Sequence, residues 1–325
     1  MSERTLAQAI NMGLREALSF NDDVMLLGED IGRTGGVFRI SDGLLDEFGP
    51  ERVVDTPVAE SGIVGAAFGL AVGGWRPIAE IQFLGFAYPA YDQIVSHVSR
   101  IRNRSRHRFT APLVIRIPHG GGIGAAEHHS ESTEAIFAHT PGLKVVVPSN
   151  PVDGKGLLAT AVADPDPVVF LEPIRLYRSV KAEVTDDPYE VPLGQASIVR
   201  HGDDVTLIGW GAAMRDIGRA ADRLAAEGID ATVVDVRSLV PFDAPTVIDA
   251  VRATGRAVVV AEAHRTAGFA AEVVATIQEE ALYSLQAPVA RVSGWDTVVP
   301  LKRAERHYIP DPQRIVGAVR RTLEA

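Results

Sequence analysis

Cysteine is absent from this chain of 325 residues. Its absence excludes disulfide bonds, thiolate metal ligands and a cysteine nucleophile, and is typical of proteins kept in a reducing compartment. Residues 1–4 also lack the apolar core of a secretory signal peptide. We therefore expect a cytoplasmic protein.

An excess of positive charge and a long apolar run are missing as well. The net charge of −10 argues against general nucleic-acid binding. The longest weakly polar stretch, residues 61–75, is too short and too rich in glycine to span a bilayer. One local basic run, without interleaved aromatic residues, comprises Arg100, Arg102, Arg104, Arg106 and Arg108. We interpret this run as a subunit contact or a solvated surface, and we expect neither nucleic acid nor membrane as a partner.

The residues that are present predict two α/β domains. Hydrophobic residues make up 46% of the chain and charged residues 23%, which is typical of a globular protein long enough for two domains. Short apolar runs alternate with helical patterns, as in parallel sheets covered on both faces by helices. Strands are predicted at residues 24–27, 78–83, 113–117, 145–147, 168–171, 205–208, 231–234 and 257–260. Helices are predicted at residues 6–18, 61–71, 91–101, 154–162, 216–226, 244–252 and 270–282.

A polar stretch divides the two domains. It begins at Lys181 and contains two aspartates and a proline, after which the strand and helix alternation restarts. We therefore place a linker at residues 181–192, between a domain of residues 1–180 and a second domain of residues 193–325.

A single carboxylate, Glu60, precedes a glycine-spaced and almost uncharged helical pattern. Gly62, Gly65 and Gly69 recur at helical spacing, which suits close packing against a neighbour and offsets the helix-weakening effect of glycine. A lone acid in an apolar setting can have its pKa tuned for catalysis. Alternatively, Glu60 is only a first-turn residue favoured by the helix dipole. The residues alone leave both interpretations open.

Six short motifs occur in the order of a known family. They are Gly-Glu-Asp at 28–30, Asp-Thr-Pro-Val-Ala-Glu at 55–60, Ala-Glu-Ile-Gln-Phe at 79–83, Glu-His-His-Ser-Glu-Ser at 127–132, Phe-Leu-Glu-Pro at 170–173 and Gly-Trp-Asp-Thr at 294–297. Together they resemble the beta subunit of thiamine-diphosphate-dependent 2-oxo acid dehydrogenases of the branched-chain type, from about residue 5 onward. The resemblance implies a transketolase-like pyrimidine-binding domain followed by a transketolase C-terminal-like domain.

The resemblance also implies roles for individual residues. Glu60 is expected to bind a ring nitrogen of the cofactor's aminopyrimidine and to act in acid–base catalysis. His129 is expected to face the substrate, handle protons and position the acceptor lipoyl group. The other implied cofactor contacts are Glu29, Val58, Ala59, Gln82 and Phe86. The implied substrate contacts are Phe83, Leu84, Gly85, Phe86, His128, His129, Ser130 and Glu131. For Gln82 and His128, a solvated side chain is the alternative.

Metal binding is predicted at one place only, and by the resemblance alone. Some relatives hold an alkali cation such as potassium, and the matching residues are Ala111, Leu113, Val114, Ala161, Asp164 and Asp166. Asp166 stands where some relatives have asparagine. The histidines at 128, 129 and 139 do not have the compact spacing of zinc ligands.

Two glycine-containing turns suggest other ligands only weakly. Residues 205–214 form a strand–turn–helix pattern like a dinucleotide fingerprint, but Met214 takes the place of the third glycine and Trp210 is bulky within the turn. The glycine run at 120–124 lacks the lysine of a P-loop, so it either cradles phosphate or only lets a loop approach a ligand.

The Gly-Asp-Gly and Asn motif, with which the wider thiamine diphosphate family anchors magnesium and diphosphate, is missing. The chain therefore resembles half of an active site. An alpha subunit is expected to supply the magnesium and diphosphate pocket within a heterotetramer of two alpha and two beta subunits. This enzyme would serve a lipoyl acyltransferase core.

The predicted function is oxidative decarboxylation of a branched-chain 2-oxo acid with acyl transfer to lipoyl groups. Pyruvate or acetoin dehydrogenase is the alternative within this class. A non-catalytic binding or scaffold subunit is the alternative from another class.

Overall fold

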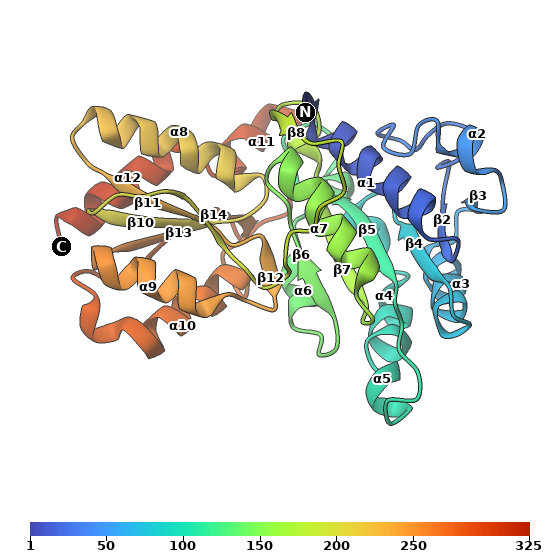
Figure 1. Ribbon diagram of the computed structural model, residues 1–325. Helices are drawn as coiled ribbons and strands as arrows, with labels where there is room; N and C mark the ends of the chain where they lie inside the picture. Colours follow the sequence, from blue (N-terminus) through green and yellow to red (C-terminus); the bar gives the residue numbers. More distant parts are fainter.

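The chain forms two α/β domains that lie side by side, as a computed structural model of residues 1–325 shows (Figure 1). The first sheet has seven strands in the order β12-β6-β7-β5-β4-β2-β3, and the second has five in the order β14-β13-β10-β11-β9. This arrangement confirms the predicted α/β class with two tandem, mainly parallel sheets.

The first sheet is parallel except at one edge. Its strands are β2 (Val24–Gly28), β3 (Val53–Asp55), β4 (Arg76–Glu80), β5 (Val114–His119), β6 (Lys144–Val146), β7 (Val168–Pro173) and β12 (Ser238–Val240). Only β12 runs antiparallel, and it pairs with β6 although it comes from the second half of the chain. The predicted strand at 78–83 ends early, at Glu80, so Gln82 and Phe83 lie in the loop that follows.

Helices cover both faces of the first sheet. One face packs against α1 (Leu6–Phe20) and α7 (Pro151–Ala163), and the other against α3 (Glu60–Val72). Helix α1 begins with a capping box, in which Gln8 N donates to Thr5 Oγ1 and Thr5 N donates to Gln8 Oε1. The predicted helix at 91–101 is interrupted, because α4 (Tyr91–Gln93) and α5 (Ile101–Arg104) flank a π-helical turn at Ile94–Val98.

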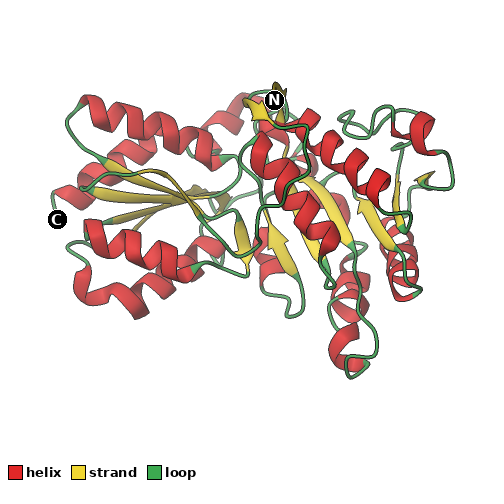
Figure 2. Cartoon of the chain, in the orientation of Figure 1, coloured by secondary structure: helices red, strands yellow, loops and turns green.

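The second domain repeats the sandwich on a smaller scale. Its strands are β9 (Ser197–Arg200), β10 (Val205–Gly209), β11 (Ala231–Asp235), β13 (Ala257–His264) and β14 (Ala290–Gly294). Its helices are α8 (Ala213–Ala226), α9 (Ala244–Thr254), α10 (Phe269–Ala281), α11 (Lys302–Tyr308) and α12 (Pro312–Leu323). Figure 2 shows this sheet between two helical layers, with α8 and α12 packed on one face and α9 and α10 on the other.

The polar stretch between the domains is not entirely a linker. Residues 181–184 form strand β8 (Lys181–Val184), which pairs antiparallel with β1 (Ser2–Thr5). The sequence gives little sign of this strand, because it is short, polar and paired with residues at the other end of the domain. The domain boundaries themselves stay a prediction.

None of the helices is both long enough and apolar enough to cross a membrane.

Candidate active site

Three polar residues lie together where neighbouring strands of the first sheet end. Glu29 directly follows β2, Glu60 follows β3 as the first residue of α3, and Gln82 follows β4. Because β2, β3 and β4 are parallel, their carboxyl ends meet at one edge, which is where α/β sheets bind ligands. The Gln82 amide donates to the Glu29 carbonyl oxygen over 3.4 Å, so it is not simply a solvated side chain.

Glu29 is a buried acid with one unsatisfied oxygen. Its Oε1 is shielded from solvent and has no hydrogen-bond partner within the chain. Burial, and next the negative charge of Glu60, raise the pKa of the Glu29 carboxyl. A buried acceptor without a partner costs free energy, so this atom is suited to receive a donor from a ligand.

The segment leading to Glu60 faces outward. Val58 is 81% exposed and Ala59 is exposed too, whereas Glu60 is half-buried. Two of the three glycines of α3 lack the close neighbours that their spacing predicts, because a Cβ on Gly69 would meet nothing within 4 Å and one on Gly62 only Ala59. Gly65 does have a neighbour, since its Cβ would lie 3.5 Å from Gln93 Oε1 on α4. Within this chain, the face of the helix with Gly62 and Gly69 is open.

Aromatic rings surround His129. The His129 ring centroid lies 4.6 Å from that of Phe83 and 5.1 Å from that of Phe86, both in edge-to-face geometry. His129 Nδ1 is buried without a partner, while His128 lies in the same 3₁₀ turn, Glu127–His129, and is exposed. The structure thus brings His129 together with the rings predicted to contact substrate, and a solvated role fits His128 better.

Gly85 makes this assembly possible. A Cβ on Gly85 would lie only 2.2 Å from the carbonyl oxygen of His128, so any other residue would push the histidine turn away. Two of the predicted substrate contacts point elsewhere. Leu84 is buried in the hydrophobic core, and the Ser130 hydroxyl donates to the carbonyl of Ala126.

Tyr88 was not predicted, but it lies at the rim of this cluster. Its hydroxyl donates to Glu131 Oε2, and its ring lies 6.0 Å from that of His128. Burial raises the pKa of the Glu131 carboxyl, an effect that the charge of His264 partly offsets. The only sequence signal for Tyr88 is its place two residues after Phe86.

A buried ion network lies within the strands of the first sheet next to the site. Arg116 on β5 is 1% exposed, and it donates from Nε and Nη2 to Glu172 on β7 (2.6 and 2.9 Å) and from Nη1 to Glu80 on β4 (2.8 Å). The Tyr177 hydroxyl also donates to Glu172. The network therefore joins three neighbouring strands. Its sequence signal is the presence of charged residues within otherwise apolar strands.

The glycine loop after β5 does not cradle phosphate. Gly121 N donates to Glu262 Oε1, while Gly122 N and Gly124 N donate to the two carboxylate oxygens of Glu305, over 2.7 and 3.0 Å. These acids belong to the second domain, so the loop amides are occupied at the domain interface.

The turn that resembles a dinucleotide site is also filled from within the chain. A Cβ on Gly211 would lie 2.7 Å from the side chain of Val147 in the first domain. Trp210 is buried and donates to Glu134, and the buried Asp235 accepts from Ser149. First-domain side chains therefore occupy the space that a dinucleotide would need.

Two of the six predicted alkali-cation residues already have cationic partners. Asp164 pairs with Lys144, and Asp166 with Arg102 over 2.5 Å. The Leu113 carbonyl accepts from Val168 N. The carboxylates of this group therefore fit an added cation poorly. No group of three or more His, Asp or Glu side chains is arranged to hold a metal ion.

Comparison with known proteins agrees with this architecture. Residues 2–180 match the transketolase pyrimidine binding domain, and residues 194–315 match the transketolase C-terminal domain. A solved structure described as a split gene transketolase, inactive beta4 tetramer, superposes with a TM-score of 0.77 at 25% identity, covering 99% of this chain and 98% of that one. Fold and site thus define a chain of the transketolase class.

Relatives with higher sequence identity to this chain assign it to one family within the transketolase class. The pyruvate dehydrogenase E1 component subunit beta of Bacillus subtilis is 48% identical over 324 residues, with 100% of both chains covered. The subunit of the same name from Acholeplasma laidlawii is 47% identical over 321 residues, covering 99% of this chain and 98% of the relative. The chain belongs to the transketolase-like family of E1 beta subunits of 2-oxo acid dehydrogenases, which confirms the resemblance at the level of this family but not its branched-chain type. Membership of this family implies thiamine diphosphate as the cofactor.

Proposed function

We propose that this chain is the beta subunit of a pyruvate dehydrogenase E1 component. The observation that carries the proposal is its 46–48% identity, over nearly the whole length, to subunits of that name from three genera. This evidence favours the pyruvate alternative over the branched-chain 2-oxo acid that the motifs predicted first.

The open edge of the first sheet fits the aminopyrimidine end of thiamine diphosphate. Glu60 would accept a hydrogen bond from a ring nitrogen and hold the proton that is exchanged there. The unsatisfied Oε1 of Glu29 and the partly exposed ring of Phe86 offer a further acceptor and a stacking surface. When bound, thiamine diphosphate supplies the electron sink for decarboxylation of a 2-oxo acid.

His129 would serve the substrate side of the same site. Its edge-to-face contacts with Phe83 and Phe86 fix the ring, and its buried Nδ1 has no hydrogen-bond partner within the chain. Histidine changes charge near neutral pH, so this ring could exchange a proton during acyl transfer to a lipoyl group. The apolar rings of Phe83 and Phe86 would keep water away from a group bound beside the histidine.

The alpha subunit completes the site. The chain has no Gly-Asp-Gly motif, and the amides of its glycine loop are already bonded to Glu262 and Glu305. The exposed Val58 and the open glycine face of α3 offer a surface on which a partner can pack next to Glu60. We therefore propose that the partner holds magnesium and diphosphate in a cytoplasmic heterotetramer that serves a lipoyl acyltransferase core.

Co-expression with the alpha subunit tests this function. We expect the assembled complex to decarboxylate pyruvate with a kcat/KM at least about tenfold above that for 3-methyl-2-oxobutanoate, the discrimination that a few buried methyl groups provide. The beta chain alone is the control and should turn over neither acid. The opposite preference would restore the branched-chain prediction. An assembled, cofactor-loaded complex without any turnover would favour a scaffold role.

A further inference from the structure

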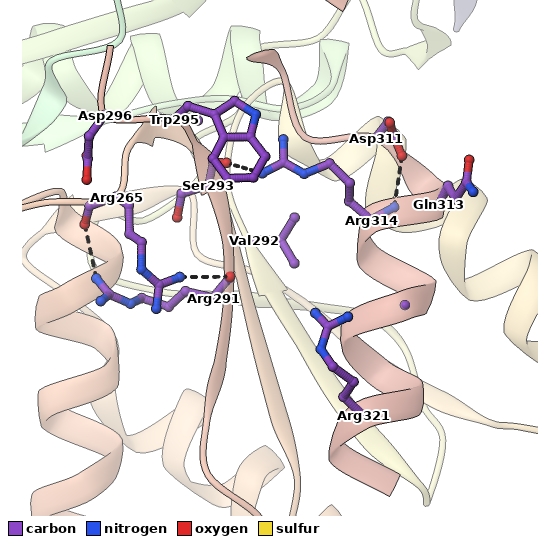
Figure 3. Close-up of a pocket in the computed structure, with 12 residues that line it drawn as sticks. Arg265, Arg291, Val292, Ser293, Trp295, Asp296, Asp311, Gln313, Arg314 and Arg321 are labelled. Carbon is purple, nitrogen blue, oxygen red and sulfur yellow. Dashed lines mark hydrogen bonds between the residues drawn. The ribbon is translucent and has the colours of Figure 1, made fainter. Parts of the chain in front are cut away.

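A second, positively charged cavity lies in the C-terminal domain, far along the chain from the candidate active site. It has a volume of about 460 Å³ and opens beside β14 and α12. Figure 3 shows four arginines around it, Arg265 and Arg291 on one side and Arg314 and Arg321 on the other, with Ser293 and Trp295 between them. The proposed catalytic function makes no use of these residues.

None of the four arginines forms an ion pair with a carboxylate of the chain. Arg265 and Arg291 each donate to the backbone carbonyl of the other, over 3.3 and 3.1 Å. Arg314 donates to the carbonyls of Tyr308 and Ser293. Backbone carbonyls satisfy hydrogen bonds but carry no formal charge, so none of these guanidinium groups has a directly paired carboxylate like those of Arg116.

The two acids that line the cavity are engaged elsewhere. Asp296 accepts from the backbone and hydroxyl of Thr266 (2.8 and 2.7 Å), hydrogen bonds that lower the pKa of its carboxyl. Asp311 caps α12 by accepting from Arg314 N over 2.9 Å. Four arginines and two aspartates give the lining a net charge of about +2.

The cavity also has a polar group without a partner. The Ser293 hydroxyl is buried, and no atom of the chain forms a hydrogen bond with it. Burial, and next the positive charge of Arg265, lower the pKa of the Arg291 guanidinium. A bound anion would relieve this repulsion between arginines and could also bond the hydroxyl.

We propose that this cavity binds a small phosphomonoester through its phosphate group. A phosphomonoester carries about −1.5 to −2 charges near pH 7, which matches the charge of the lining. A guanidinium group can donate two parallel hydrogen bonds to two oxygens of one phosphate. Several arginines can therefore bind the same phosphate group from different sides. The volume exceeds that of an inorganic ion and lies in the range of small-molecule sites. The Arg314 guanidinium lies 4.7 Å from the ring centroid of Trp295, which is 58% exposed and offers its remaining aromatic surface to the rest of the ligand.

Calorimetry on the assembled alpha–beta complex tests this site. Saturating thiamine diphosphate and magnesium first fill the cofactor's own diphosphate site. Adenosine 5′-monophosphate and inorganic phosphate are then titrated, with adenosine as the probe that lacks phosphate. We expect saturable binding of both phosphate probes, none of adenosine, and weaker binding as salt is raised. Binding of adenosine equal to that of its monophosphate would overturn the proposal, as would the absence of saturable phosphate binding.

Four variants distinguish phosphate binding in the cavity from an effect of the overall surface charge. Arg291→Gln should raise the Kd for phosphate about tenfold or more. Arg321→Gln should act in the same direction without harming the fold, because its exposed side chain makes no hydrogen bond within the chain. Gly317→Leu on α12 should block the cavity without changing charge. The control is Arg223→Gln, an exposed and unpaired arginine on α8.

Unchanged affinity in both Arg321→Gln and Gly317→Leu would refute the site. So would a loss in Arg223→Gln as large as that in Arg321→Gln, because it would show that only the overall charge matters.

Discussion

The two domains use the carboxyl ends of their parallel strands differently. In the first domain, Glu60 lies half-buried after the exposed Val58 and Ala59, and one carboxylate oxygen of the buried Glu29 has no partner within the chain. In the second domain, Trp210, Asp235 and Glu262 occupy the corresponding edge, and all three are bonded to first-domain groups. The carboxyl ends of the strands thus form a candidate ligand site in the first domain, where a polar group lacks a partner. In the second domain they form a domain interface, where the polar groups have partners.

The transition between these two uses lies within the first domain. Strand β4 ends at the open site, whereas the loop after the neighbouring β5 donates its amides to Glu262 and Glu305 of the second domain. Arg116 lies at this transition and bonds the strands on both sides. Changes on the covered side are therefore expected to act on stability, and changes on the open side on turnover.

Arg116→Met should have the largest effect. It leaves Glu80 and Glu172 buried without their cation, which costs about 3–5 kcal/mol of stability. Urea unfolding followed by tryptophan fluorescence, to which Trp75 in the first domain contributes with Trp210 and Trp295, measures the loss. Arg102→Met is the control, because its pairing with Asp166 is partly solvated and worth about 1 kcal/mol or less. Equal losses in both variants would contradict a special role for the buried network.

Glu60→Gln tests the open side. The amide keeps the shape of the side chain but cannot hold the catalytic proton, so decarboxylation by the assembled complex should fall about 100-fold or more. Light scattering should show an unchanged complex, because the substitution removes no packing contact. The exposed Glu51, changed to glutamine, is the matched control. Near-normal turnover at saturating cofactor would remove Glu60 from the mechanism.

Glu134→Gln tests the covered side through pH. Burial raises the pKa of the Glu134 carboxyl from 4.5 to about 7, so the folded state binds more protons than the unfolded state between these values. The contribution of Glu134 to the free energy of unfolding is therefore fully present below pH 4.5 and is lost as pH rises toward 7.

Glutamine stays neutral and keeps the acceptor for Trp210 Nε1. At about 1.4 kcal/mol per pKa unit, the rise from 4.5 to about 7 sets an upper limit of about 3 kcal/mol, and the variant should gain about 1–2 kcal/mol of this at pH 8 relative to the parent chain. Urea unfolding at pH 5 and pH 8 measures this difference, with the exposed Glu127→Gln as control. An identical pH dependence in the parent and Glu134→Gln would show that Glu134 is ionised throughout.

His129→Ala and His128→Ala compare two residues of one turn at the open edge. Loss of His129 should slow lipoyl acylation about tenfold more than decarboxylation measured with an artificial electron acceptor, since its role is proposed for acyl transfer. Loss of the exposed His128 should be milder in both assays. Equal losses in the two assays for His129→Ala would indicate substrate binding or loop folding instead.

The sequence predicts the central strands well, because strands buried on both faces are continuous apolar runs, such as residues 24–27 and 205–208. It does not predict β1, β8 and β12, which are three or four residues long and pair with distant segments. Short strands carry little periodicity, and their pairing depends on the assembled tertiary structure.

The same contrast holds for the candidate site. Local motifs single out Glu60 and His129 in the sequence, and the fold places His129 beside Phe86 and Glu60 close enough to Glu29 to raise the pKa of its carboxyl. The ties between the glycine loop and Glu262 or Glu305 span well over 100 residues, so spacing does not reveal them. The ion network of Arg116 is not predicted from the sequence, because its partners lie on β4 and β7. Only the order of the strands in the sheet brings these partners next to Arg116.

Strand β12 has a consequence for how the chain is made. When a ribosome has released residues 1–180, six strands of the first sheet are available, but the edge at β6 waits for residues 238–240. An uncovered strand edge is a template for pairing with other chains. The nascent protein is therefore most exposed to aggregation during synthesis of its second domain, and residues 1–180 expressed alone would keep that exposed edge permanently.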